Sequence, residues 1–209
     1  MVAHHAYSFQ FHNSKENPYV MQEILDAPLT EKGRQQAYAL QPEVQAFSKQ
    51  PELIILSPNC RALQTGVIIF EHLLGKVPVI AHEMVREENG VHVCDKRRPT
   101  SRQAKEFPMV DFALLETEED EMFKNSRRET KMEVGDRVYS FMEWFSQRCE
   151  THVGLVSHSG WLLTAFNGVC ECDEKLKGWF HTGEMRSCKL EFIRNCKKEG
   201  NHSESTRPK

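Results

Sequence analysis

The sequence lacks any long apolar run, and no stretch approaches the roughly 18 consecutive apolar residues that indicate a membrane-spanning helix. Its first residues lack the basic and apolar regions of a secretory signal. It also lacks a strong excess of charge, with 27 Lys and Arg against 30 Asp and Glu. Because binding of nucleic acid or of an acidic membrane draws on a basic surface, neither is expected as a partner. We therefore expect a cytoplasmic protein.

Cysteine spacing gives no indication of a metal site. The chain has seven cysteines, an odd number that suits a reducing compartment better than a disulfide framework. Cys170 and Cys172 form a C-x-C pair, followed by the single residues Cys188 and Cys196. This is not a zinc-ribbon spacing. We predict reduced thiols, no bound metal and no cofactor.

Short apolar segments alternate with segments of helical periodicity along most of the chain. A β-strand followed by a helix and another strand is typical of a parallel sheet covered by helices on both faces. The sequence therefore predicts a three-layer α/β/α sandwich with a mostly parallel central sheet. The predicted strands are 52–58, 77–81, 153–156 and 187–195. One predicted helix begins after Thr30, its N-cap residue. Two others occupy 59–75 and 129–147, and a fourth starts at Trp161.

We expect residues 1–196 to form a single domain. Within it, residues 89–128 are long, charged and weakly periodic, which is typical of a cap or insertion over a site. Residues 197–209 contain no apolar side chain and are predicted to be a disordered tail.

Polar side chains follow three of the predicted strands, where ligand sites of parallel sheets are found. Arg61 follows the strand at 52–58, Arg86 and Glu87 follow the strand at 77–81, and His158 follows the strand at 153–156. Arginine binds phosphoryl groups in bidentate fashion, and free N–H groups at the helix start behind His158 would add positive potential. Alone, each residue is more often a solvated or turn residue, but together they favour a phosphate site.

Four segments carry a resemblance to a known family. DAPLTEKGRQQA, LSPNCRALQT, VREENGVHVCDKRRP and VGLVSHSGWLLTAF resemble, in order, the conserved blocks of the histidine phosphatase superfamily, which has the phosphoglycerate mutase-like fold. The stretches GVHVCDKRR and FPMVDFALLETEEDEMF look closest to the phosphoglycerate mutase-like proteins of plants and lower eukaryotes. The similarity extends from about residue 12 to about residue 193.

The resemblance implies a role for individual residues. Arg61 matches the family's phosphate-clamping arginine, and Glu87 matches its proton donor. His158 matches the second histidine, which contacts the transferred phosphoryl group. His12-Asn13 matches a His-Asn pair whose asparagine, here Asn13, also contacts phosphate.

The N-terminus departs from the family pattern, in which a core strand ends in Arg-His and that histidine is the nucleophile. Counting back from Asn13 without gaps leaves no nucleophile, whereas two extra residues align His4-His5-Ala6 with the motif and place the nucleophile at His5. The alternation of apolar and polar side chains over residues 6–11 predicts a replacement strand that would deliver His12 instead. Only three residues precede His4, so the first strand is expected to be short.

These features predict a phosphomonoester hydrolase that acts without metal on a small phosphorylated substrate through a phosphohistidine, with His5, Glu87 and His158 as catalytic residues and Asn13 and Arg61 as phosphate ligands. A phosphatase is favoured over a mutase because nothing in the sequence indicates a closed site that retains a bisphosphate intermediate. The alternative is an inactive relative that binds a phosphorylated ligand or partner. Lys96, Arg97 and Arg98 predict either affinity for an anionic substrate or a solvated basic turn.

Overall fold

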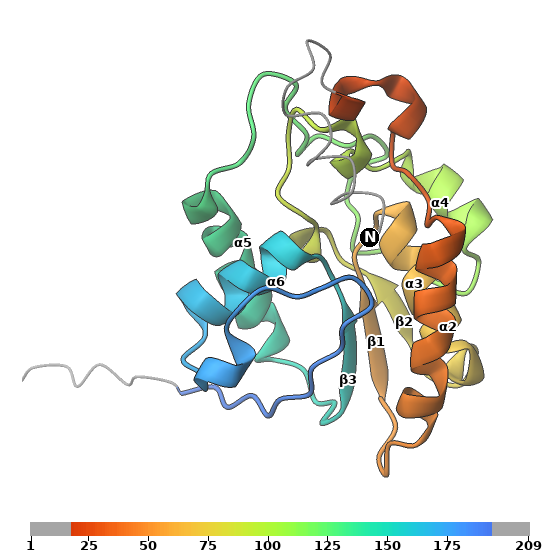
Figure 1. The fold of residues 1–209 in the computed structure, drawn as a ribbon, viewed down its shortest axis with the longest axis vertical. Coiled ribbons are helices and arrows are strands. Elements are labelled where there is room, and N and C mark those ends of the chain that lie inside the picture. The colour runs from red at the N-terminus through yellow and green to blue at the C-terminus, as the bar shows by residue number, and fades with distance from the viewer. Residues whose placement is uncertain (1–17, 194–209) are drawn as a thin grey trace, which may run out of the picture.

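The computed structural model describes residues 18–193, and three strands in it form one parallel sheet. β1 (Leu53–Leu56) lies between β2 (Val79–Ala81) and β3 (Val153–Val156), so the strand order is β2-β1-β3 (Figure 1). All four residues of β1 are buried, as expected for a central strand covered on both faces. The predicted α/β class with parallel strands is confirmed.

Helices cover both faces of this sheet, which makes the three predicted layers. α2 (Glu31–Gln45) and α3 (Cys60–Ile69) lie on one face, and α5 (Lys131–Phe145) and α6 (Ser159–Thr164) lie on the other (Figure 1). Side chains of β1 alternate between the two cores: Ile54 and Leu56 pack on the α3 side, and Leu53 and Ile55 pack on the α5 side. Each such buried side chain contributes roughly 1.5–3 kcal/mol to folding.

Hydroxyl side chains cap the two longest helices. The Thr30 hydroxyl accepts a hydrogen bond from the Gly33 amide at 3.1 Å, so the predicted N-cap of α2 is confirmed. Thr130 forms a reciprocal capping box with Glu133 at the start of α5. Among residues 18–193, no helix combines the length and the apolar character that crossing a membrane requires.

Two predicted elements differ from the structure. The helix predicted over 59–75 ends at Ile69 and continues as a 3-10 turn, Glu71–Leu73, before Gly75 with φ of +72°. The strand predicted from 187 is wrong over its described part, because residues 187–193 form no strand. Apolar alternation alone does not make a strand, which also needs a neighbour for its ladder hydrogen bonds. Phe192 and Ile193 accordingly remain exposed.

Residues 89–128 are anchored by apolar side chains despite their charged composition. They contain the 3-10 turn Val93–Asp95 and α4 (Thr100–Glu106), and are otherwise irregular. Asp111 pairs with the outer edge of β2, where its amide donates to Val79 O and its carbonyl accepts from Ala81 N. Four of the segment's side chains join the core on the α3 side: Phe107, Val110, Phe112 and Leu115.

Candidate active site

The register of the sheet brings the residues that follow β1 and β3 to one edge. Leu56 lies opposite Val156, and the Ser57 amide continues the ladder by donating to Val156 O at 2.9 Å. His158 therefore lies beside the end of β1, where its Nε2 is 2.7 Å from the Ser57 hydroxyl. Ser57 was missed by the sequence analysis, although it occupies a strand end just as His158 does.

Arg61 and His158 are in direct contact. Arg61 lies in the first turn of α3, and its Nη2 is 3.1 Å from His158 Nδ1. Their exposed fractions are 4% and 0%, so the contact is buried. Two of the residues predicted to form the site therefore meet as neighbours, although they are 97 positions apart in the sequence.

The hydrogen bonds define which nitrogen of His158 carries a proton. A guanidinium can only donate hydrogen bonds, so His158 Nδ1 must accept from Arg61 and is unprotonated. The remaining proton of a neutral imidazole then lies on Nε2, which donates to the Ser57 hydroxyl. In this arrangement His158 is a neutral imidazole that takes its orientation from Ser57 and Arg61.

Two groups from residues 89–128 hold the Arg61 guanidinium. Nη1 donates to Cys94 O at 2.7 Å, and Nη2 donates to Asp95 Oδ1 at 2.9 Å. Burial alone would lower the pKa of Arg61, but Asp95 is the first of several charges that raise it, and the net shift is upward. Arg61 is therefore a permanent cation, and its positive charge acts directly on His158.

Glu87 lies at the start of α6, beside this pair. Its Oε2 accepts from the Gly160 amide at 3.3 Å, and its Oε1 accepts from the Glu88 amide at 3.0 Å. A Cβ atom at position 160 would overlap Glu87 Oε1, so any larger residue there would displace the Glu87 carboxyl group. One of the amides at this helix start that were expected to be free for phosphate, that of Gly160, therefore donates to Glu87 instead.

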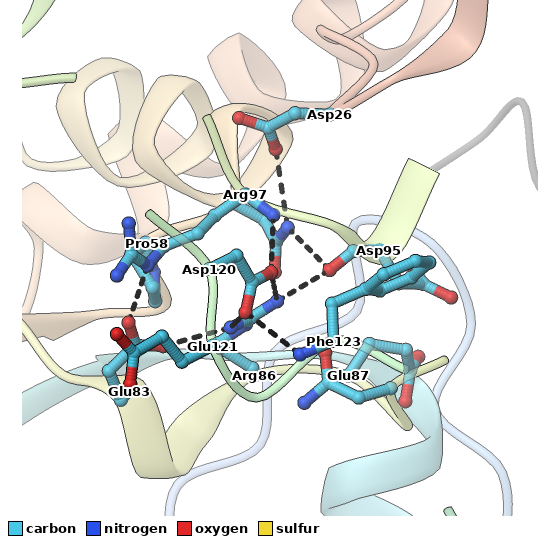
Figure 2. Close-up of polar contacts among 12 residues, drawn as sticks. Asp26, Pro58, Glu83, Arg86, Glu87, Asp95, Arg97, Asp120, Glu121 and Phe123 are labelled. Atoms are coloured by element: carbon cyan, nitrogen blue, oxygen red, sulfur yellow. Dashed lines mark hydrogen bonds and ion pairs between the residues drawn. The ribbon is translucent and has the colours of Figure 1, made fainter. Parts of the chain in front are cut away.

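Arg86 does not face the predicted phosphate site, which corrects the expectation of two converging arginines. It is fully buried and forms an ion pair with Asp120 through both terminal nitrogens, as Figure 2 shows. Glu83 accepts a further hydrogen bond from Arg86 Nη1, and Asp95 O accepts one from Nη2. Arg86 therefore ties the end of β2 to residues 89–128.

In the basic run from Lys96 to Arg98, the two arginines are paired with acidic side chains rather than solvated. Arg97 is 2% exposed and binds Glu83 together with the carbonyl groups of residues 117–119. Arg98 binds Asp26 and Glu106. Lys96 lies 5.7 Å from the centroid of the Phe123 ring. The two arginines are structural ties, so their charge is not available to an anionic substrate.

The remaining predicted site residues lie outside the described part of the chain. His5 and Asn13, together with the alternative nucleophile His12 and the predicted first strand, fall within residues 1–17. The predictions for these residues are not tested by the structure. Within the described part, Arg61, His158 and Glu87 come together, and Ser57, Asp95 and Gly160 are the additional residues that hold them.

Comparison with known proteins places this site in a family context. The model of the histidine phosphatase superfamily (branch 1) matches residues 10–200. Phosphoglycerate mutase-like protein 1 of Arabidopsis thaliana is 35% identical over 202 residues, which cover 81% of this chain and 72% of that protein. A probable phosphatase of Schizosaccharomyces pombe is 28% identical over 138 residues, covering 64% of this chain and 62% of that protein.

Two solved phosphatase structures align with this chain, each with a TM-score below 0.5. The ecdysone phosphate phosphatase of Bombix mori, in complex with tungstate, aligns with a TM-score of 0.47 at 14% identity, over 82% of this chain and 78% of that chain. A mycobacterial glucosyl-3-phosphoglycerate phosphatase aligns with a TM-score of 0.44 at 28% identity, over 69% of this chain and 70% of that chain.

Proposed function

Because this chain belongs to the histidine phosphatase superfamily, we propose that it is a metal-independent phosphomonoester hydrolase that acts through a phosphohistidine. The observation that carries the proposal is the direct contact between Arg61 and His158, with Glu87 at the start of the adjacent helix. A permanent cation and an imidazole can stabilise the charge of a phosphoryl group, and a carboxyl group can protonate the leaving oxygen, while a second histidine supplies the nucleophile.

In the proposed reaction, a neutral histidine nitrogen attacks phosphorus and the ester P–O bond breaks. Glu87, as the carboxylic acid, gives its proton to the leaving oxygen. Water then attacks the phosphohistidine and returns a proton to Glu87, releasing inorganic phosphate and free histidine. Arg61 and His158 would stabilise the charge on the phosphoryl oxygens in both steps.

The proposed nucleophile is His5, with His12 as the alternative, and Asn13 is the proposed additional phosphate ligand. His158 itself is a poor nucleophile, because Arg61 donates to one of its nitrogens and the other is bonded to Ser57. Residues 89–128 are the proposed cap, because they supply the groups that touch Arg61.

The test is hydrolysis of an aryl phosphate in the presence of a metal chelator. Wild-type protein should release phosphate, and the His158→Ala variant should lose about 10²–10³-fold in kcat/KM, the loss typical of removing a group that stabilises transition-state charge. His181→Ala is the matched control, because His181 is exposed. Equal rates in wild type and His158→Ala would exclude this site.

A second candidate function is phosphate-dependent binding without turnover. It is favoured by the absence of an Arg-His pair before His12-Asn13. This candidate predicts that the protein binds inorganic phosphate through Arg61 but forms no acid-labile phosphoenzyme. Labelled phosphate recovered on His5 or His12 after reaction with a phosphomonoester would rule it out.

A further inference from the structure

We propose that Asp95 is a positioning residue that orients the Arg61 guanidinium for the phosphoryl group and couples it to residues 89–128; this inference rests on the proposed function. Asp95 is 1% exposed. Its Oδ1 accepts from Arg61 Nη2 at 2.9 Å, and its Oδ2 accepts from Arg128 Nη1 at 3.1 Å. The carboxylate therefore bridges two arginines, one on α3 and one at the end of the insertion.

The contacts of Arg61 explain why orientation depends on this carboxylate. Cys94 O and Asp95 Oδ1 take one N–H from each terminal nitrogen, which defines the plane of the guanidinium. Nη2 also donates to His158 Nδ1. Without Asp95, the guanidinium would keep two of these three contacts, to Cys94 O and His158, and would lose its one charged partner among them, so its orientation would be less restricted. A bidentate contact with a phosphoryl group depends on that plane.

The backbone of Asp95 is held as firmly as its side chain. Its carbonyl accepts from Arg86 Nη2 at 2.8 Å and from Asn59 Nδ2 at 3.2 Å. Asn59 is the N-cap residue of α3, the helix that carries Arg61. Asp95 is thus fixed relative to both β2 and α3, so its side chain can set the orientation of Arg61 from a rigid base.

Burial and ionic pairing would also fit a purely structural role, so the test must separate the two roles. We suggest a double-mutant cycle with Asp95→Asn and Arg61→Lys, measuring kcat/KM for an aryl phosphate and the affinity for inorganic phosphate. If Asp95 acts through Arg61, Asp95→Asn should lower kcat/KM about tenfold or more in wild type, but less than about twofold in the Arg61→Lys background. Equal factors in both backgrounds would overturn the proposal.

Asp120→Asn is the matched control. Asp120 also comes from residues 89–128, its carboxylate is fully buried, and it pairs with another buried arginine, Arg86. This variant should lower the melting temperature, while kcat/KM of the folded protein stays within about twofold of wild type in either background. If Asp120→Asn couples to Arg61 as strongly as Asp95→Asn does, Asp95 has no special role.

The two readouts also separate this inference from the proposed function. If wild type binds phosphate without turnover, the hydrolase proposal fails. The double-mutant cycle of Asp95→Asn and Arg61→Lys is then evaluated from the affinities for inorganic phosphate. Coupling of Asp95 to Arg61 in that affinity would support the inference on its own. If wild type neither hydrolyses the ester nor binds phosphate, both proposals fail.

Discussion

Arg61 and Arg86, two of the buried arginines, differ in how their charges are compensated. Arg86 contacts two carboxylates, Asp120 and Glu83, and its pKa is raised mainly by hydrogen bonding to Asp120 after burial has lowered it. Arg61 contacts Oδ1 of Asp95, whose Oδ2 pairs with Arg128, and it also contacts the His158 imidazole. Both arginines have a buried Nε without a hydrogen-bond partner in the part of the chain that is described, so the difference lies in the terminal nitrogens.

This difference separates a structural arginine from a candidate ligand-binding one. Arg86 belongs to a cluster in which two arginines are balanced by two carboxylates. Arg86 pairs with Asp120 and Glu83, and Arg97 also pairs with Glu83. Around Arg61, an incoming phosphoryl group would meet a cation that, within residues 18–193, forms one ion pair, with a carboxylate that also pairs with Arg128. The exposed fractions of Arg61 and Arg86 do not distinguish the two roles, because both side chains are buried.

The largest effect is expected for Arg86→Met, which leaves Asp120 buried without its ionic partner. Breaking a buried pair costs about 3–5 kcal/mol, so chemical denaturation should report a loss of this size. Arg61→Met should cost less stability, because Asp95 keeps Arg128 as a partner. If the two variants lose the same stability, the comparison fails.

The next effect concerns activity rather than stability. Arg61→Met should lower kcat/KM for an aryl phosphate by about 10²–10³-fold, as expected when a group that stabilises the transition state is removed. Arg86→Met should change kcat/KM of the folded fraction far less. Steady-state kinetics below the melting temperature of both variants would check this, and a reversed ranking would assign the clamp to Arg86.

A third prediction concerns stability at acid pH and depends on His82, which lies just after β2. Burial lowers the pKa of His82 to about 4, from an ordinary value of about 6.5. The unfolded chain therefore binds a proton that the folded chain does not, so stability should fall as pH drops from about 6.5 to 4, by up to about 3 kcal/mol. His82→Phe keeps an aromatic ring against Phe141 and Trp144 and should flatten this dependence. If the unfolding free energies of wild type and His82→Phe fell in parallel as the pH drops, the prediction would be contradicted.

The smallest effect is expected for Gly160→Ala. The added methyl group would overlap Glu87 Oε1 and displace the carboxyl group, so kcat/KM should fall by about tenfold or more, approaching the value of Glu87→Gln. Gly168→Ala is the control, because a Cβ there meets no atom within 4 Å. Unchanged kinetics in Gly160→Ala would show that the position of Glu87 is not critical.

The sequence predicts the strand ends well because parallel strands impose a common edge. Arg61, Glu87 and His158 follow three different strands, and adjacency in the sheet brings them together. The same periodicity does not reveal which charges pair, so Arg86 was expected at the site but binds Asp120. Asp95 lies in a charged, aperiodic stretch, and nothing in its spacing indicates that it reaches Arg61.

Resemblance to the family contributed what periodicity does not. It implied the roles of Arg61, Glu87 and His158, which remain proposals. The strand predicted at 187–195 is wrong over residues 187–193, because an alternating pattern does not specify a pairing partner.

The most direct test of the phosphate site is calorimetric binding of inorganic phosphate to wild type, Arg61→Met and Arg86→Met. This measurement does not depend on the identity of the nucleophile or of the substrate. The account predicts that wild type binds phosphate, that folded Arg86→Met retains this affinity, and that Arg61→Met loses it. Equal phosphate affinity in wild type and Arg61→Met would contradict the account.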